Sequence, residues 1–190
     1  AIILGHVELL KRPDSPHFER SLRMIMQAAQ DGAHTVRRIQ EFVRAKPETH
    51  TTPVDLSQLA DDVINLTRPR WHNDMLGQGA RVALAHDLPS VPLVLGNGAE
   101  LREVVTNLIL NAIDAMPHGG SLAIRTGASN GFCWLEVADS GHGIPAEVRA
   151  RIFEPFYTTK ASRGTGLGLA VSRSIALRHN GDLTVESTPG

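Results

Sequence analysis

The sequence has little cysteine, little net charge and no long apolar run. Cys133 is the single cysteine, so a disulfide framework is excluded and a cysteine metal site is disfavoured, which suits a reducing compartment. The net charge is −1, from 19 basic and 20 acidic side chains, and gives no electrostatic case for binding nucleic acid or an anionic membrane. No apolar run of about 20 residues and no signal peptide occurs, so no membrane segment is expected here. The expected location is the cytoplasm, and a membrane anchor elsewhere in the parent protein stays open.

What the sequence does contain fits a globular protein. Its 190 residues are enough for one large domain or two small ones, and 42% of them are hydrophobic and 21% charged. The chain opens on AIILGHVELL, a helical pattern with neither a start methionine nor an N-cap. We therefore expect it to be a piece of a longer protein.

Residues 1–46 have the pattern of a helical hairpin. Residues 1–11 should end one helix, and Ser15 and Pro16 should start a second that runs from about His17 to Ala45. Its apolar residues alternate spacings of four and three, at Phe18, Leu22, Ile25, Ala29, Gly32, Val36, Ile39 and Val43. Such a heptad seam, about four repeats long, is typical of helical bundles, and a lone hairpin buries little surface. We expect a homodimer whose two hairpins form a four-helix bundle, or else packing against the chain's own second domain.

A polar linker, Lys46–Pro53, precedes a second domain over residues 53–190. The expected helices are 55–67, with Asp55 and Gln58 as a capping box and a stop before Pro69, then 101–116, capped by Asn97, and 166–179. The expected strands are 80–86, 91–95, 121–126, 132–138 and 182–187, with a loop over 71–79. Helices and mostly antiparallel strands alternate without the order of a parallel sheet. We therefore predict an α+β fold, a two-layer α/β sandwich.

The stretch Leu101–Met116, LREVVTNLILNAIDAM, has two opposed faces at helical spacing. The apolar stripe consists of Leu101, Val104, Val105, Leu108, Ala112 and Ala115, and the polar stripe of Glu103, Asn107, Asn111 and Asp114. Asparagine is a poor helix former because its amide competes for backbone hydrogen bonds, so two in mid-helix need a reason. An oxygen-lined stripe suits a hydrated Mg²⁺ that carries phosphates, and an ordinary polar face is the alternative.

The stretch Asp139–Ile144, DSGHGI, directly follows an expected strand. Two glycines spaced by one residue allow a flat ligand to approach the backbone closely. A buried Asp139 carboxylate only accepts hydrogen bonds, so it would bind the amino group of adenine and repel the carbonyl of guanine. The alternative is an ordinary turn.

A second glycine-rich stretch, Gly164–Leu169, opens the last expected helix. Its backbone N–H groups can hold phosphates, with Lys160 and Arg163 as nearby cations and the Thr165 hydroxyl as a donor. It is neither a Rossmann motif, because no strand precedes it, nor a P-loop, because GxxxxGK[ST] is absent.

Between the two glycine-rich stretches lies Phe153–Lys160, FEPFYTTK. Aromatic residues beside a segment rich in Thr, Ser and Gly predict a lid that closes over a nucleotide. A loop pinned by Phe153 and Phe156 is the plainer interpretation, and the two are compatible.

Together these motifs resemble those of the sensor histidine kinases. Asn107–Ala112 resembles their N box, Asp139–Gly143 their G1 box, Phe153–Phe156 their F box and Gly164–Leu169 their G2 box, in the same order and with similar gaps. The resemblance covers residues 53–190. Less specifically, the hairpin is similar to the dimerisation and phosphotransfer domain of the same family.

The resemblance implies a Bergerat-type ATP-binding fold behind a dimeric bundle. By that likeness Asn111 is the metal ligand for Mg²⁺, Asn107 lies beside the phosphates and Asp139 binds adenine. The implied catalytic residues are Asn107, Glu103 and Lys160. The implied nucleotide-binding residues are Asn107, Asn111, Asp114, Asp139, Gly141, Gly143, Ile144, Phe156, Lys160, Gly164, Thr165, Gly166, Leu167 and Gly168.

Members of this family transfer the γ-phosphoryl group of ATP to a histidine on the first bundle helix, and then to an aspartate of a response-regulator receiver domain. The acceptor is followed by an acidic residue, whereas His6, His17 and His34 of the hairpin are not. We expect the acceptor upstream of Ala1. The last strand also ends earlier than the family pattern.

Two other functions fit parts of the sequence. ATPases of the gyrase, chaperone and mismatch-repair type resemble it in the Asn111 and glycine elements, but use a glutamate at the position of Asn107 as the base for water. Asparagine cannot be a general base, which argues against efficient hydrolysis, whereas a histidine nucleophile needs less help. A nucleotide-sensing dimerisation module without kinase chemistry is the second alternative.

Overall fold

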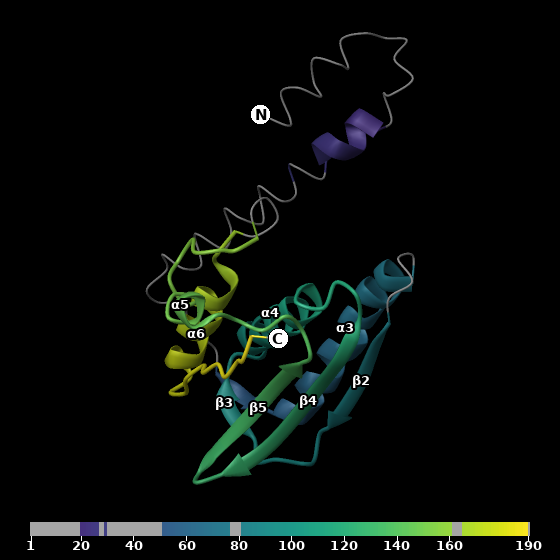
Figure 1. Cartoon of the computed structure of the whole chain (residues 1–190). Helices are drawn as coiled ribbons and strands as arrows, with labels where there is room; N and C mark the ends of the chain where they lie inside the picture. The colour runs from purple at the N-terminus through teal and green to yellow at the C-terminus, as the bar shows by residue number, and fades with distance from the viewer. Residues whose placement is uncertain (1–19, 27–28, 30–50, 77–80, 161–164, 190) are drawn as a thin grey trace. The chain divides into compact units, whose positions relative to one another are not determined.

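The computed structural model describes residues 20–26, 29, 51–76, 81–160 and 165–189. The chain divides into two compact units, residues 1–45 and 46–190, and each is described by itself. In the first unit residues 20–26 are helical (Figure 1). Most of the predicted hairpin and its seam lies outside the described residues, so the four-helix bundle stays a prediction.

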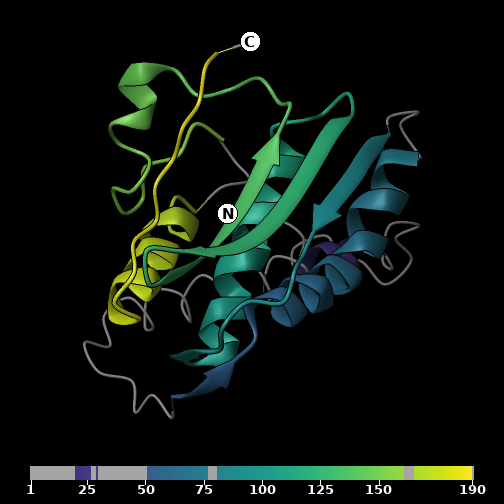
Figure 2. The ribbon, with the colours of Figure 1, turned by 90° about the horizontal axis from the view of Figure 1, so that it is seen from below.

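The second unit packs helices against one face of a mixed sheet, as the two-layer prediction requires (Figures 1 and 2). The sheet has the order β2-β4-β5, with β2 parallel to β4 and β4 antiparallel to β5. Its strands are β2 (Val82–Asp87), β4 (Gly120–Ser129) and β5 (Phe132–Asp139); β1 (Thr52–Val54) pairs antiparallel with β3 (Val94–Gly96). The helices are α3 (Leu56–Leu76), α4 (Gly98–Asp114), α5 (Ala146–Arg149) and α6 (Gly168–Arg178). The helices of the second unit contain no segment long and apolar enough to cross a membrane.

The core lies between the sheet and the helices α3 and α4. Leu122 and Ile124 alternate along β4 with exposed residues, and their side chains are at most 1% exposed. The most buried core residue of α4 is Ile109, at 1%, and Met116 just after the helix is equally buried, whereas Leu108 of the predicted stripe is only half-buried. The core face of α4 is therefore turned slightly away from the one predicted, because Ile109 and not Leu108 faces the sheet side.

At α3 the predicted cap is confirmed, but the predicted capping box and the predicted end of the helix were wrong. Asp55 does cap α3, since its Oδ1 accepts from the N–H of Ser57 and Gln58, but the Gln58 side chain binds Asp62 instead of closing a capping box. The helix then continues through Pro69 to Leu76. Proline has no N–H, so Pro69 leaves the carbonyl of Asn65, four residues earlier, without its helical hydrogen bond. Asn65 lies on the exposed face of α3, where water can bind that carbonyl.

Two further elements differ from the prediction. The end of the predicted linker forms the strand β1, because pairing with β3 satisfies its backbone despite Pro53. Residues 181–189 form no strand, so the predicted final strand was wrong. Side chains hold that segment instead: Ser187 Oγ accepts from the N–H of Ile144 at 2.8 Å, and Ser187 O accepts from Arg149.

Candidate active site

The C-terminal half of α4 presents two side-chain oxygens to a lysine from a distant part of the chain. The ammonium group of Lys160 donates to Asn111 Oδ1 at 3.1 Å and to Asp114 Oδ2 at 2.7 Å. Asn111 and Asp114 are three residues apart, so they lie on one face of the helix. The Lys160 and Asp114 side chains are 39% and 57% exposed, so the pair is open to solvent. Two members of the predicted polar stripe therefore bind one cation.

Asn107, one turn earlier on α4, lies in a different environment. Its side chain is 7% exposed, and Nδ2 donates at 3.3 Å to the hydroxyl of Ser172, a fully buried residue of α6. Glu103, a further turn back, is half-buried. The polar stripe is therefore not one open face as its pattern indicated, because α6 packs over Asn107.

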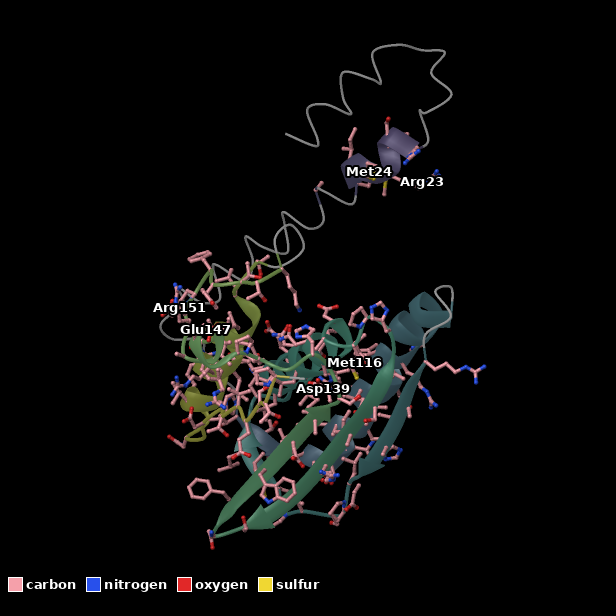
Figure 3. The ribbon with its side chains drawn as sticks, in the orientation of Figure 1. Arg23, Met24, Met116, Asp139, Glu147 and Arg151 are labelled. Atoms are coloured by element: carbon pink, nitrogen blue, oxygen red, sulfur yellow. The ribbon has the colours of Figure 1, made fainter. Side chains whose placement is uncertain are left out.

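The loop after β5 packs against the C-terminal end of α4. The N–H of His142 donates to Ala115 O at 3.2 Å, and a Cβ on Gly141 would come within 2.6 Å of that same oxygen, so glycine is required there. Asp139 lies at the end of β5 near Met116, which follows α4 (Figure 3). Its carboxylate is thus at the same end of α4 as the two oxygens that hold the lysine.

Asp139 is exposed, so the prediction of a buried carboxylate was wrong. It is the last residue of β5, and it pairs with Leu122 close to where β4 begins. Its Oδ1 accepts from the N–H of Gly141 at 2.8 Å. That bond orients the carboxylate, whose other oxygen can accept a further hydrogen bond.

The segment Phe153–Phe156 is held by two arginines. Arg151 binds Glu154 through Nε at 2.9 Å and stacks over the Tyr157 ring at 4.2 Å, and the bond to Glu154 raises the pKa of Arg151. Arg173 of α6 stacks over the Phe153 ring at 4.9 Å and binds Asp182. The N–H of Leu183 and, next, Arg173 lower the pKa of Asp182. Phe153 is therefore anchored, as the interpretation of a pinned loop requires, whereas the Phe156 side chain is 62% exposed and does not pin the loop.

The second glycine-rich stretch begins at Thr165 in the described residues, and Gly164 lies outside them. Gly166 O accepts from the N–H of Phe156 at 2.9 Å, and Gly166 has φ +66° against the Phe156 backbone, where a side chain would collide. Phe156 is 62% exposed and itself has φ 67°. Leu167 is the N-cap residue of α6 and makes no side-chain capping hydrogen bond. The first N–H groups of the helix therefore receive no hydrogen-bond acceptor from this side chain.

The arrangement fits a nucleotide carried by a divalent metal. Asn111 and Asp114 are oxygen donors of the kind that Mg²⁺ prefers, and they already hold a positive charge. The Asp139 carboxylate lies at the same end of α4, and uncapped N–H groups lie at the start of α6. Two contacts in this region had no sequence signal: Ser172, which looked like an ordinary helical serine, and Arg173 against Phe153.

Comparison with known proteins identifies the fold family. Residues 96–190 match the family described as histidine kinase-, DNA gyrase B-, and HSP90-like ATPase. The chain belongs to this family. Its match begins just before α4 and includes all four motifs, so the family resemblance of the sequence is confirmed.

The relatives of this family member are sensor histidine kinases. Signal transduction histidine-protein kinase AtoS of Escherichia coli K12 is 31% identical over 99% of this chain, and sensor histidine kinase RppB of Synechocystis is 33% identical over 100% of it. The chain spans 30% and 43% of the length of these two proteins. The crystal structure of full-length ShkA in complex with AMPPNP is similar with a TM-score of 0.72 and 26% identity, over 91% of this chain and 37% of that one.

Proposed function

We propose that this chain is the catalytic region of a sensor histidine kinase, which binds Mg·ATP and phosphorylates a histidine of the dimerisation hairpin. The observation that carries the proposal is the cation site of α4, where Asn111 and Asp114 hold Lys160 beside the loop of Asp139. A carboxylate that can bind the adenine base and oxygens that can bind the metal thus lie at one end of one helix. The kinase relatives and the AMPPNP complex of ShkA support it.

The nucleotide is held at both ends in this proposal. Asp139 accepts from the exocyclic amine of adenine, with Gly141, Gly143 and Ile144 shaping the loop around the ring. The N–H groups from Thr165 to Gly168 bind the phosphates, aided by the dipole of α6. Phe156, Gly164 and Leu167 complete the set of nucleotide-binding residues.

Asn111 ligates Mg²⁺ in this scheme, with Asp114 beside it. The metal supplies charge neutralisation for the phosphates and takes few protein oxygens. Lys160 then leaves the two oxygens and binds the phosphates, because the ammonium group and the metal cannot share Asn111. The lysine therefore holds the lid segment near α4 before the nucleotide binds.

Kinase chemistry is favoured over hydrolysis by Asn107. Its buried amide donates to Ser172, and an amide cannot take a proton from water. Asn107 and Lys160 therefore act by positioning and charge stabilisation, which is most of what phosphoryl transfer needs, and Glu103 is the carboxylate of this set. A nucleotide-sensing module remains the alternative.

The partners and the domain division follow from the same proposal. Residues 1–46 form the dimerisation and phosphotransfer hairpin of a homodimer, and residues 53–190 form the catalytic domain. The phosphoryl group passes from the histidine to an aspartate of a receiver domain, in the cytoplasm.

Two measurements on the chain test this function. Calorimetric titration should show binding of Mg·ATP, and a phosphate-release assay should show almost no turnover of the bound nucleotide. Steady hydrolysis would favour a gyrase- or chaperone-type ATPase. Absence of ATP binding would contradict every version of the proposal.

A further inference from the structure

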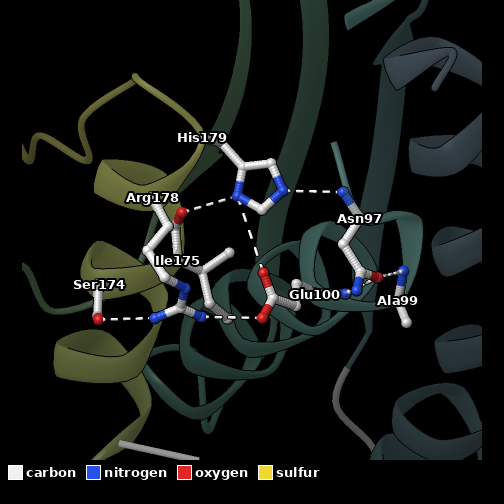
Figure 4. Close-up of polar contacts among 7 residues, drawn as sticks. All are labelled: Asn97, Ala99, Glu100, Ser174, Ile175, Arg178 and His179. Atoms are coloured by element: carbon white, nitrogen blue, oxygen red, sulfur yellow. Dashed lines mark hydrogen bonds and ion pairs between the residues drawn. The ribbon is translucent and has the colours of Figure 1, made fainter. Parts of the chain in front are cut away.

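A cluster of polar contacts joins the end of α6 to the start of α4 (Figure 4). Asn97 caps α4, because its Oδ1 accepts from the N–H groups of Ala99 at 2.9 Å and Glu100 at 3.3 Å. The N–H of Asn97 donates in turn to Nε2 of His179, the C-cap of α6, at 2.9 Å. The imidazole of His179 therefore connects the C-cap of α6 with the N-cap of α4.

The geometry fixes the protonation state of that imidazole. A backbone N–H can only donate, so the Asn97 contact requires Nε2 without a proton. Nδ1 lies 2.8 Å from Ile175 O, which only accepts, so Nδ1 carries the proton. His179 is thus held as the neutral Nδ1–H tautomer, with both nitrogens used.

A second contact runs parallel to the first. Arg178 donates to Glu100 Oε1 at 3.0 Å and to Ser174 Oγ at 2.9 Å, and the Glu100 and Arg178 side chains are 17% and 30% exposed. Glu100 Oε2 is buried, has no hydrogen-bond partner among the described residues, and lies 3.9 Å from His179 Nδ1. Close packing accompanies these bonds, since a Cβ on Gly96 would come within 2.6 Å of His179 Cδ2.

We infer that His179 is a positioning residue of the nucleotide site, whose neutral imidazole sets the register of α6 against α4. The inference rests on the proposed function, in which the start of α6 binds phosphates and Asn111 of α4 binds their metal. The two helices also contact each other between Asn107 and Ser172, so a shift at the 97–179 contact should be passed along their interface and move Gly168 relative to Asn111. The loop of Asp139 follows β5, and besides its contact with Ser187 it is held on the end of α4 by the bond from the N–H of His142 to Ala115 O, which does not involve α6.

The inference predicts that loss of the His179 contacts lowers the affinity only for ligands that carry phosphates. His179→Leu removes both hydrogen bonds at similar bulk, and should weaken Mg·ATP roughly fivefold to tenfold, as expected for a lost hydrogen bond. Adenosine, followed by NMR titration, should bind within about twofold of wild type because it lacks phosphates. His179→Gln offers a neutral acceptor to the Asn97 N–H and should recover most of the Mg·ATP affinity.

Controls separate positioning from general loss of structure. His86→Leu makes the same replacement at an exposed histidine of β2 and should change neither affinity. If His179→Leu does not fold, Gly96→Ala displaces the ring with the imidazole retained, and should give the same selective loss. An equal loss of affinity for ATP and adenosine, or an unchanged affinity for Mg·ATP, would overturn the inference. A wild-type chain that binds no Mg·ATP would instead overturn the proposed function and this inference with it.

Discussion

At the scale of single residues, the proposed function makes Asp139 the residue that selects the base. Its exposed carboxylate is fixed by the N–H of Gly141, and in the proposed site it would pair with the amine of adenine but face a carbonyl in guanine. We predict that Asp139→Ala weakens ATP binding by about 1–3 kcal/mol and does not weaken GTP binding, because the repulsion of the guanine carbonyl is removed. Calorimetric titration with both nucleotides measures this, with Asp87→Ala at the end of β2 as control. Equal wild-type affinity for ATP and GTP would contradict the role.

Asn111 acts through the metal in the proposed site. Mg²⁺ keeps several waters and takes few protein oxygens, so losing one ligand should weaken Mg·ATP more than metal-free ATP. Asn111→Ala is therefore predicted to lower affinity mainly in the presence of Mg²⁺, whereas Lys160→Gln should lower it also with a chelator. Calorimetry under both conditions makes the comparison. A similar loss with and without metal in Asn111→Ala would show that the amide binds the nucleotide directly.

At the scale of elements, the start of α4 was predictable and its surroundings were not. Asn97 followed by Glu100 is a local capping signal, and the structure has that cap. By contrast, the path of α3 through Pro69 depends on which helix face is exposed, and β1 depends on a partner strand about 40 residues away. The spacing of residues along the sequence predicts neither the path of α3 nor the pairing of β1.

The same limit applies to the site. The motifs of Asp139 and Gly166 are local in sequence, so their residue types already indicated a ligand-binding loop. The ion pair of Lys160 with Asp114 joins residues far apart in the chain, and burial of Asn107 requires α6 to pack over it. Contacts of this kind follow from tertiary packing, which a periodic pattern does not specify.

The cap at Asn97 gives a stability prediction for this element. Asn97→Ala removes the acceptor for two N–H groups of α4 and should lower the free energy of unfolding by about 1 kcal/mol. Alanine keeps the backbone N–H that His179 accepts, so the loss reports the cap alone. Urea denaturation measures it, and Asn97→Asp, which keeps a capping oxygen, should lie within a few tenths of a kcal/mol of wild type. An alanine variant as stable as wild type would show that the cap contributes little.

At the scale of the whole molecule, the hairpin seam predicts a homodimer. Ile25→Glu would bury a charge at a seam position, which is costly without a partner charge. We predict a dimer for the wild type and a monomer for this variant in sedimentation over a range of concentrations. Met26→Glu, at a neighbouring residue that is 59% exposed and outside the seam, should stay dimeric. A wild-type chain that stays monomeric at high concentration would contradict the dimer.

The most direct test of the kinase proposal is phosphoryl transfer from γ-labelled Mg·ATP. We predict that this chain binds ATP without labelling itself, because no hairpin histidine has an acidic neighbour, and that a chain extended upstream in its gene becomes labelled. The label should be lost in acid, as phosphohistidine is, and absent after Asn111→Ala. An extended chain that binds Mg·ATP normally and takes up no label would contradict the proposal and favour a nucleotide-sensing module.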